Sequence, residues 1–280
     1  MAQYGLIGRT LKHSFSQQYF REKFITEEIG DSDYSLFELE RIEDFPRLLK
    51  RNPGLQGLNV TIPYKTSIIP YLDELDKTAE AVGAVNTIRF KNDRLRGYNT
   101  DVFGFRTSLL RLVNQTREER NMEETAPGLH LPTAPVLFSF GNAAQEHSII
   151  GSMNALILGT GGASKAVAYA LESEGANCRT VSRTPGRGSL TYEGLNADLI
   201  ETYELIVNTT PLGTHPDPSF PDIPYEGINR SHYLFDLVYN PPLTPFLRKG
   251  KERGAAVRNG LEMLHLQADR SYDIWTGISS

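Results

Sequence analysis

The stretch ALILGTGGASKAV, residues 155–167, decides the fold of this chain. Its apolar start is typical of a buried strand, and Gly159, Gly161 and Gly162 stand between that strand and a predicted helix over residues 165–174. Glycines allow a tight turn and let the backbone approach a pyrophosphate, which also meets the unpaired N–H groups at the helix start. The stretch therefore favours a dinucleotide-binding unit over an ordinary strand-to-helix turn.

The next predicted strand indicates which dinucleotide is bound. A site for an unphosphorylated adenosine ribose usually has Asp or Glu at the end of this strand, roughly 20 residues past the glycines. This chain has Ser182, Arg183 and Thr184 there, with Arg187 close by. A planar guanidinium suits a 2′-phosphate and the hydroxyls add donors, so the sequence favours NADP over NAD. A solvated loop arginine is the alternative for Arg183.

Further apolar runs follow in the second half, at residues 205–210 and 233–240. Such runs are typical of strands buried on both faces, and their alternation with helices predicts a parallel sheet with right-handed crossovers. A last helix is predicted over residues 260–275, and its apolar residues recur at helical spacing from Leu261 to Trp275. This apolar face must pack against another part of the protein.

The first half also alternates between strands and helices. The patterns predict strands at residues 4–8, 35–39 and 57–63, helices at residues 15–30 and 42–49, and a hairpin of residues 84–90 and 95–101. The expected fold class is α/β. We expect a substrate-binding catalytic domain of residues 1–105 plus 260–280, an NADP-binding Rossmann-like domain of residues 106–259, and a cleft between them.

A long excursion is predicted within the second domain. A helix expected over residues 103–113 leads into residues 114–153, which hold a charged run at residues 117–124, three prolines and the aromatic patch VLFSFG at residues 136–141. A structureless loop of this length is unusual in a compact domain. We therefore hypothesise that VLFSFG packs on the cofactor domain or on a neighbouring subunit.

The composition argues against several classes of protein. With 29 Lys and Arg against 34 Asp and Glu, the 280 residues have a net charge of −5, which disfavours nucleic-acid and anionic-membrane partners. The single cysteine, Cys178, cannot form an intramolecular disulfide, and no Cys/His cluster has metal-ligand spacing. No apolar run approaches the roughly 18 residues of a membrane span. We expect a cytoplasmic protein without a metal, an export signal or a membrane anchor.

Three polar residues of the first half follow predicted strands. Lys65 ends the stretch NVTIPYK, Asn86 lies in GAVNT, and Asp101 ends GYNTD. Each on its own is typical of a surface loop, and an exposed Lys–Asp ion pair contributes about 0–1 kcal/mol to stability. Each residue alone is therefore weak evidence for a functional site.

Eight separated motifs give the chain a resemblance to a known family. They resemble shikimate dehydrogenases in order and spacing over nearly the whole chain, apart from the excursion. The motifs are GLIG…HSFS (residues 5–16), NVTIPYK (59–65), GAVNT (83–87), GYNTD (97–101), GTGGASKAV (159–167), NTTPLG (208–213), DLVYNPPLTPFL (236–247) and NGLEMLHLQA (259–268).

The resemblance implies a two-domain enzyme that reversibly reduces 3-dehydroshikimate to shikimate with NADPH, in chorismate and aromatic amino-acid biosynthesis. It implies that Lys65 and Asp101 are the catalytic pair. The residues that match the substrate side are Ser14, Ser16, Thr61, Asn86, Tyr239 and Gln267. Those that match the cofactor side are Gly159, Gly161, Gly162, Ala163, Ser182, Arg183 and Thr184, with Thr209 and Gly260 flanking the nicotinamide.

The chemistry of these residues is compatible with the implied roles. Hydride addition to a carbonyl leaves an alkoxide that needs a proton and a nearby positive charge, and Lys65 can supply both. Ser14 and Ser16 lie two residues apart, so in an extended segment both hydroxyls point to one side and can hold a carboxylate. A helix cap is the alternative for these serines. A solvent-facing side chain is the alternative for Gln267.

The chain departs from the family in two respects. It has Thr10 and Gln17 where shikimate dehydrogenases commonly have proline, and its excursion is longer than their connection. Two other functions stay open. One is a quinate/shikimate dehydrogenase-like paralogue with relaxed cofactor use, and the other is a non-catalytic NADP-sensing module, which the presence of both Lys65 and Asp101 disfavours. A homodimer is among the expected assemblies.

Overall fold

The computed structural model describes residues 2–12, 14–125 and 149–278. The chain divides into two units, one of Met1–Gly104 with Leu264–Ser280 and the other of Phe105–Met263. The first unit therefore contains both ends of the sequence, whereas the second is one continuous segment. The domain boundaries expected from the sequence stay a prediction.

The second unit is built on a parallel sheet. Its strands are β7 (Asn154–Leu158), β8 (Asn177–Ser182), β9 (Leu190–Thr191), β10 (Leu205–Asn208), β11 (Tyr233–Asp236) and β12 (Ala256–Asn259). They lie in the order β12-β11-β10-β7-β8-β9, and every registered pair is parallel. The predicted parallel sheet is confirmed, and the strand order reverses beside β7, where α/β sheets of this type bind ligands.

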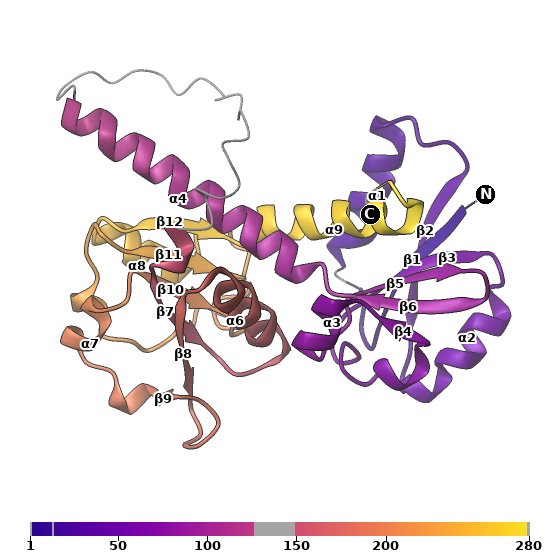
Figure 1. The fold of residues 1–280 in the computed structure, drawn as a ribbon, viewed down its shortest axis with the longest axis horizontal. Coiled ribbons are helices and arrows are strands. Elements are labelled where there is room, and N and C mark those ends of the chain that lie inside the picture. The colour runs from indigo at the N-terminus through magenta and orange to yellow at the C-terminus, as the bar shows by residue number, and fades with distance from the viewer. Residues whose placement is uncertain (1, 13, 126–148, 279–280) are drawn as a thin grey trace. The chain divides into compact units, whose positions relative to one another are not determined.

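Helices cover this sheet because its strands are apolar on both faces. Helix α6 (Gly162–Glu174) packs on β7 and β8, and α8 (Pro245–Glu252) packs on β11 and β12, while the short α7 (Ala197–Glu201) contacts the turn Tyr225–Gly227. Figure 1 shows these elements around the sheet. Four large side chains of the core are almost fully buried, namely Leu156, Ile206, Leu234 and Phe246.

The first unit has a mixed sheet. Its strands are β1 (Ala2–Gly8), β2 (Ser32–Glu38), β3 (Leu55–Val60), β4 (Glu74–Leu75), β5 (Thr87–Lys91) and β6 (Arg94–Tyr98), in the order β2-β1-β3-β5-β6-β4. The predicted hairpin is confirmed as antiparallel β5 and β6. Its turn residues Asn92 and Asp93 both have positive φ, 52° and 58°, which is the geometry of a two-residue hairpin turn.

Four helices pack around this mixed sheet. They are α1 (Phe15–Thr26), α2 (Phe45–Arg51), α3 (Lys77–Val82) and α9 (Leu261–Thr276), of which α9 begins in the second unit. The indole of Trp275 on α9 stacks on Tyr4 with ring centroids 4.7 Å apart, and its Nε1 donates to the carbonyl of Ile88 at 3.0 Å. The apolar face of the last helix thus packs on the sheet formed by the start of the chain.

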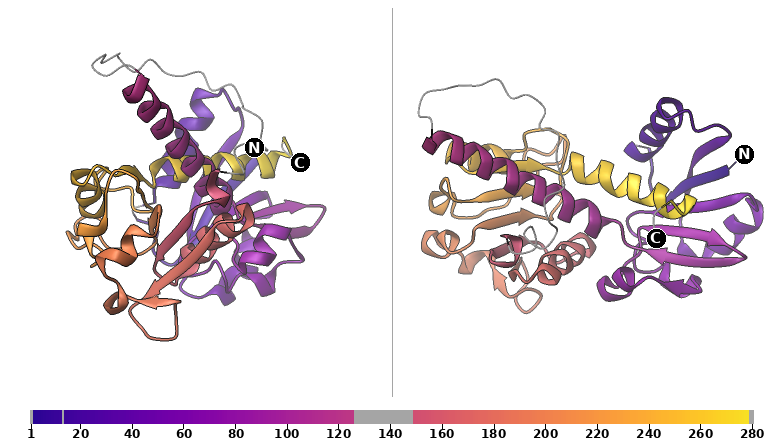
Figure 2. Two further views of the ribbon diagram at one scale, coloured as in Figure 1. Left: turned by 60° about the vertical axis from the view of Figure 1, so that its left-hand side comes forward. Right: turned by 45° about the horizontal axis from the view of Figure 1, so that its top comes forward.

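Helix α4 (Asp101–Thr125) is longer than the sequence pattern suggested. The predicted end at Val113 is wrong, and the helix continues through the charged run (Figure 2). Arg and Glu are good helix formers, so the charged run is compatible with a helix. The guanidinium of Arg120 also lies 5.2 Å from the ring centre of Tyr233, which holds this part of the helix against β11. The VLFSFG patch lies outside the described residues.

Across the described parts of the chain, no helix is both long enough and apolar enough to cross a lipid bilayer.

Candidate active site

The loop that follows β3 carries Lys65 and is anchored on both sides of that residue. The Tyr64 side chain is 3% exposed, and its hydroxyl donates to the carbonyl of Leu39. The carbonyl of Lys65 itself accepts from the backbone N–H of Val85 at 2.7 Å. These two bonds fix the backbone at Lys65, so only the side chain is free to adjust.

Asp101 is the first residue of α4, and Asn99 fixes the start of that helix. The Asn99 side chain is 6% exposed; its Nδ2 donates to the carbonyl of Ala84 at 3.0 Å and its Oδ1 accepts from the N–H of Asp101 at 3.1 Å. Asn99 was not among the predicted site residues, although an Asn just before a helix start is a common capping signal.

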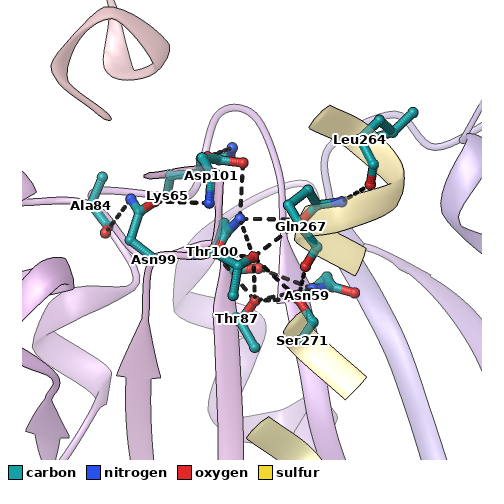
Figure 3. A network of polar contacts seen from close by, with 11 residues as sticks. Asn59, Lys65, Ala84, Thr87, Asn99, Thr100, Asp101, Leu264, Gln267 and Ser271 are labelled. Atoms are coloured by element: carbon teal, nitrogen blue, oxygen red, sulfur yellow. Dashed lines mark hydrogen bonds and ion pairs between the residues drawn. The ribbon is translucent and has the colours of Figure 1, made fainter. Parts of the chain in front are cut away.

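Lys65 and Asp101 meet as a close ion pair. Lys65 Nζ lies 2.6 Å from Asp101 Oδ2, and the two side chains are 25% and 13% exposed. Figure 3 shows them side by side at one end of a polar network. The pair is thus largely shielded from solvent but still has an accessible ammonium group, which can donate a proton to an oxygen atom of a ligand.

Asn86 holds the carboxylate of Asp101 in one orientation. Its Oδ1 accepts from the N–H of Thr100 at 2.8 Å, which fixes the amide because a flipped amide would place its NH₂ against that donor. Its Nδ2 then donates to Asp101 Oδ1 at 2.9 Å. The two carboxylate oxygens of Asp101 are therefore divided, Oδ1 to Asn86 and Oδ2 to Lys65.

Gln267 on α9 reaches the same group of side chains. Its Oε1 accepts from Asn86 Nδ2 and from Thr100 Oγ1, both at 3.3 Å, and its Nε2 donates to the carbonyl of Leu264 at 3.0 Å. The structure thus brings four of the predicted residues together, Lys65, Asp101, Asn86 and Gln267. Their catalytic and substrate-binding roles stay a prediction at this point.

The two serines predicted to hold a carboxylate differ in backbone geometry. Ser14 precedes α1, is extended with φ −71° and ψ 120°, and makes no side-chain capping bond, whereas Ser16 is already the second residue of that helix. The expected extended segment through both serines is therefore wrong, because α1 begins at Phe15. Thr61 follows β3, and its N–H donates to the carbonyl of Ile7 at 2.9 Å.

The second unit has a cavity of about 630 Å³ over the glycine-rich turn. Gly159 has a φ of +114°, and an added Cβ would lie 2.7 Å from Thr209 Oγ1. At Gly161 and Gly162 an added Cβ would meet no atom within 4 Å. Of the residues predicted for the cofactor, the cavity is lined by Gly159, Gly161, Ser182, Arg183, Thr184 and Thr209, whereas Gly162, Ala163 and Gly260 do not line it.

The cavity wall at the end of β8 is basic. Arg183 and Arg187 both line the cavity and are exposed, and neither forms an ion pair with any other residue that the structure describes. Ser182 Oγ accepts from the N–H of Thr184 at 3.1 Å, which fixes the turn between them. Two unneutralised guanidinium groups beside an open glycine turn fit a nucleotide that carries a phosphate on its ribose.

Two further predicted residues, Tyr239 and Gly260, lie in the second unit near the ends of β11 and β12. An added Cβ at Gly260 would lie 2.2 Å from the carbonyl oxygen of Leu237, so this position requires glycine. Burial raises the pKa of the Tyr239 phenol. The predicted contact of Tyr239 with the substrate, and of Gly260 with the nicotinamide, stays a prediction.

Asp236, at the end of β11, is a buried acid that the sequence analysis missed. It is 0% exposed; its Oδ2 accepts from Thr244 Oγ1 at 2.6 Å, and its Oδ1 accepts from the N–H of Val238 at 3.0 Å and from Asn208 Nδ2 at 2.9 Å. Burial raises the pKa of this carboxyl to about 6, while the three hydrogen bonds oppose the rise.

This raised pKa predicts a pH-dependent stability. Because the folded protein holds the Asp236 proton more tightly than the unfolded chain, whose pKa is near 3.8, stability falls as the pH rises from about 4 through 6. One pKa unit corresponds to about 1.4 kcal/mol, so ionisation of this carboxyl lowers the free energy of unfolding by roughly 3 kcal/mol. Urea unfolding measures the free energy of unfolding of wild type and of Asp236→Asn at pH 4 and pH 7. The variant's value relative to wild type should be roughly 3 kcal/mol higher at pH 7 than at pH 4. The same relative value at both pH values would contradict this prediction.

Nearly the whole chain is similar to known proteins. A family model described as the shikimate dehydrogenase substrate binding domain matches residues 6–88. A protein named shikimate dehydrogenase (NADP(+)) from Carboxydothermus hydrogenoformans is 33% identical, over 98% of this chain and 91% of its own length. A protein of the same name from Methanosphaera stadtmanae is 31% identical, over 98% and 90%.

Solved structures give the same result. A crystal structure of shikimate dehydrogenase 1 from Peptoclostridium difficile has a TM-score of 0.71 and 33% identity, and the match covers 99% of this chain and 92% of that one. The structure of shikimate 5-dehydrogenase from Thermus thermophilus in complex with NADP(H) and shikimate has a TM-score of 0.74 and 28% identity, over 99% and 94%. The α/β fold expected from the sequence, with a substrate unit and a Rossmann-like unit, is confirmed.

Proposed function

This chain belongs to the shikimate dehydrogenase family, and we propose that it catalyses the reversible, NADPH-dependent reduction of 3-dehydroshikimate to shikimate. This reaction belongs to the biosynthesis of chorismate and the aromatic amino acids. The observation that carries the proposal is the pair of Lys65 and Asp101 at 2.6 Å, with the carboxylate oriented by Asn86. A pair held in this way is suited to moving a proton at a carbonyl or hydroxyl oxygen.

Lys65 is the proton donor in the direction of reduction. Its ammonium group gives a proton to the alkoxide that forms at the former carbonyl oxygen and stabilises the negative charge while it develops. Asp101 holds that ammonium group through Oδ2 and accepts a hydrogen bond from a substrate hydroxyl. Asn86 and Gln267 orient the ring hydroxyls, while Ser14, Ser16, Thr61 and Tyr239 bind the rest of the substrate.

The second unit binds NADP. The turn Gly159–Gly161 leaves open space where its backbone can approach the pyrophosphate, and Arg183 and Arg187 neutralise the 2′-phosphate with the help of Ser182 and Thr184. When bound, the reduced nicotinamide supplies the hydride. Thr209, whose Oγ1 donates to the carbonyl of Leu158 at 2.7 Å, keeps the cavity wall in place beside Gly159.

One assay tests this function. Steady-state oxidation of shikimate and of quinate is measured with NADP and with NAD in parallel. We expect the highest kcat/KM for shikimate with NADP. A higher kcat/KM for quinate or for NAD would show a quinate/shikimate dehydrogenase-like enzyme, and the absence of turnover with intact NADP binding would favour a cofactor-sensing protein.

The cofactor preference depends on Arg183. A hydrogen bond between charged groups contributes about 1.5–3 kcal/mol, so Arg183→Ala should weaken NADP binding roughly 10- to 100-fold and leave NAD binding nearly unchanged. Isothermal titration calorimetry measures both affinities. Arg179→Ala is the matched control, since Arg179 is an exposed arginine of β8, the strand directly before Arg183, and does not line the cavity. Equal losses for NADP and NAD would contradict the assignment of the 2′-phosphate.

Two further features complete the proposal. We assign the enzyme to the cytoplasm, where its lone thiol stays reduced; burial raises the pKa of Cys178 to about 12, which makes this thiol unreactive. We also propose a homodimer as the assembly in solution, and light scattering coupled to size-exclusion chromatography tests it through the molar mass.

A further inference from the structure

Four polar side chains lie in the core of the first unit, next to the residues that bind Asp101. Tyr34, Thr87 and Ser271 are 0% exposed and Asn59 is 5% exposed. Tyr34 comes from β2, Asn59 from β3, Thr87 from the start of β5 and Ser271 from α9. A buried polar group lowers stability unless it has a hydrogen-bond partner, so the partners of these groups are informative.

The hydrogen bonds among them have a defined direction. The hydroxyl of Tyr34 donates to Asn59 Oδ1 at 2.8 Å, which turns Asn59 Nδ2 to the other side. That Nδ2 donates to Ser271 Oγ at 3.0 Å and lies 3.2 Å from Thr87 Oγ1. Ser271 Oγ in turn donates to the main-chain carbonyl of Gln267 at 2.8 Å. Tyr34 therefore determines which way the Asn59 amide faces. Figure 3 shows Asn59 beside Thr87 and Ser271, the two side chains that its Nδ2 reaches.

The other end of this network is the site itself. Thr87 Oγ1 lies 3.1 Å from Asn86 Oδ1 and 2.7 Å from Ser271 Oγ, and Asn59 Nδ2 donates to the main-chain carbonyl of Asn86 at 3.3 Å. Asn86 orients Asp101, as described above, and the Gln267 carbonyl is bound by Ser271. On the side of α1, Ser16 is a hydrogen-bond partner of the Tyr34 hydroxyl and opposes the rise in the pKa of Tyr34 that burial causes.

We propose that Tyr34 is a positioning residue of the substrate site, which acts through Asn59, Thr87 and Ser271 to hold Asn86 and Gln267 in place. The inference rests on the proposed function, because it assumes that Asn86 and Gln267 bind shikimate. The ring of Tyr34 stacks on Phe20 with centroids 4.4 Å apart, and packing alone would be served as well by phenylalanine. The hydroxyl of Tyr34 instead holds the buried Asn59 amide in one of its two orientations. A buried polar network whose groups are all paired in this way has one defined arrangement.

The test removes this hydroxyl and keeps the ring. In Tyr34→Phe the oxygen Oδ1 of Asn59 loses its donor, so the amide is free to turn and the support of Asn86 and Gln267 is lost. We expect the Kd for shikimate, measured by calorimetry without cofactor, to rise about tenfold, with a similar rise in the shikimate KM and a smaller change in kcat. The Kd for NADP should change less than twofold.

Tyr4→Phe is the matched control. Tyr4 lies in the same apolar cluster, is 3% exposed and stacks on Trp275, but it is not part of the network. We expect Tyr4→Phe to bind shikimate like wild type. If Tyr4→Phe weakened shikimate binding as much as Tyr34→Phe does, the loss would be a general effect of removing a buried phenol hydroxyl. That result would overturn the inference.

Ser271→Ala provides a second test that does not depend on the folding of Tyr34→Phe. It should weaken shikimate binding in the same direction, because it removes the donor to the Gln267 carbonyl. Tyr34 acts on Gln267 through Asn59 and Ser271, so the two substitutions interrupt one path and the double variant should lose less affinity than the product of the two single losses. Shikimate affinity within twofold of wild type in either folded single variant would overturn the inference. A wild-type protein that binds NADP but neither binds nor oxidises shikimate would overturn the proposed function itself.

Discussion

Lys65→Ala should lower kcat for shikimate oxidation about 10³-fold while the KM for NADP changes little. The ammonium group of Lys65 lies 2.6 Å from Asp101 and is the proton donor and charge partner in the proposed reaction. A positioned acid or base typically contributes 10²- to 10⁴-fold to a rate, which sets the expected size. Steady-state kinetics with saturating NADP measure the effect.

Two controls make this experiment specific. Lys65→Met keeps most of the alkyl chain, so an equal loss in both variants assigns the effect to the charge rather than to packing. Lys50→Ala removes an exposed lysine from α2 of the same unit and should leave kcat unchanged. A Lys65→Ala enzyme that keeps wild-type kcat and instead shows a raised KM for NADP would reverse the division of roles between Lys65 and Arg183.

Gly57→Ala should destabilise the protein by about 3 kcal/mol. An added Cβ at Gly57 would lie 2.2 Å from Cδ1 of Trp275, and that indole is 4% exposed and bonded to the carbonyl of Ile88. The ring cannot shift without losing this bond and its stacking on Tyr4, so overpacking and an unsatisfied N–H add together. Chemical denaturation monitored by circular dichroism measures the loss in every background, including one without Trp275, the single tryptophan of the sequence.

Gly30→Ala is the matched control, since an added Cβ there meets no atom within 4 Å. Its unfolding free energy should stay within about 0.5 kcal/mol of wild type. Trp275→Phe offers a reciprocal test, because a smaller ring leaves room for the methyl group. Gly57→Ala should therefore be less destabilising in the Trp275→Phe background than in wild type. An equal penalty in both backgrounds would contradict the clash.

The sequence predicted most of the features that depend on local pattern. The apolar run before Gly159 and the glycines themselves are neighbours along the chain, so the strand, the turn and the start of α6 could all be recognised. The same holds for the hairpin turn at Asn92 and Asp93. Lys65 and Asp101 were single residues in loops, and it was the resemblance of several motifs that assigned them a role.

The features that were missed depend on distant parts of the chain. Tyr34 lies just before the predicted strand of residues 35–39, and the partners that make it part of a polar network come from β3 and, 212 residues beyond Asn59, from α9. Asp236 lies within the predicted apolar run of residues 233–240, and only the fold brings Thr244 and Asn208 to its carboxylate. The end of α4 was missed for another reason, since a charged run is compatible with both a solvated loop and a helix.

The placement of α9 also has a consequence for the order of events during synthesis. The second unit is a continuous segment, whereas the first needs a helix that the ribosome makes after the whole of the second unit. Nascent domains usually fold from the amino end onward, but here the sheet of the first unit cannot bury its surface around Tyr4 and Gly57 before Trp275 is synthesised. The second unit can therefore fold while the first is still incomplete, and chaperones that shield exposed aromatic surface would be needed longest at the sheet of the first unit.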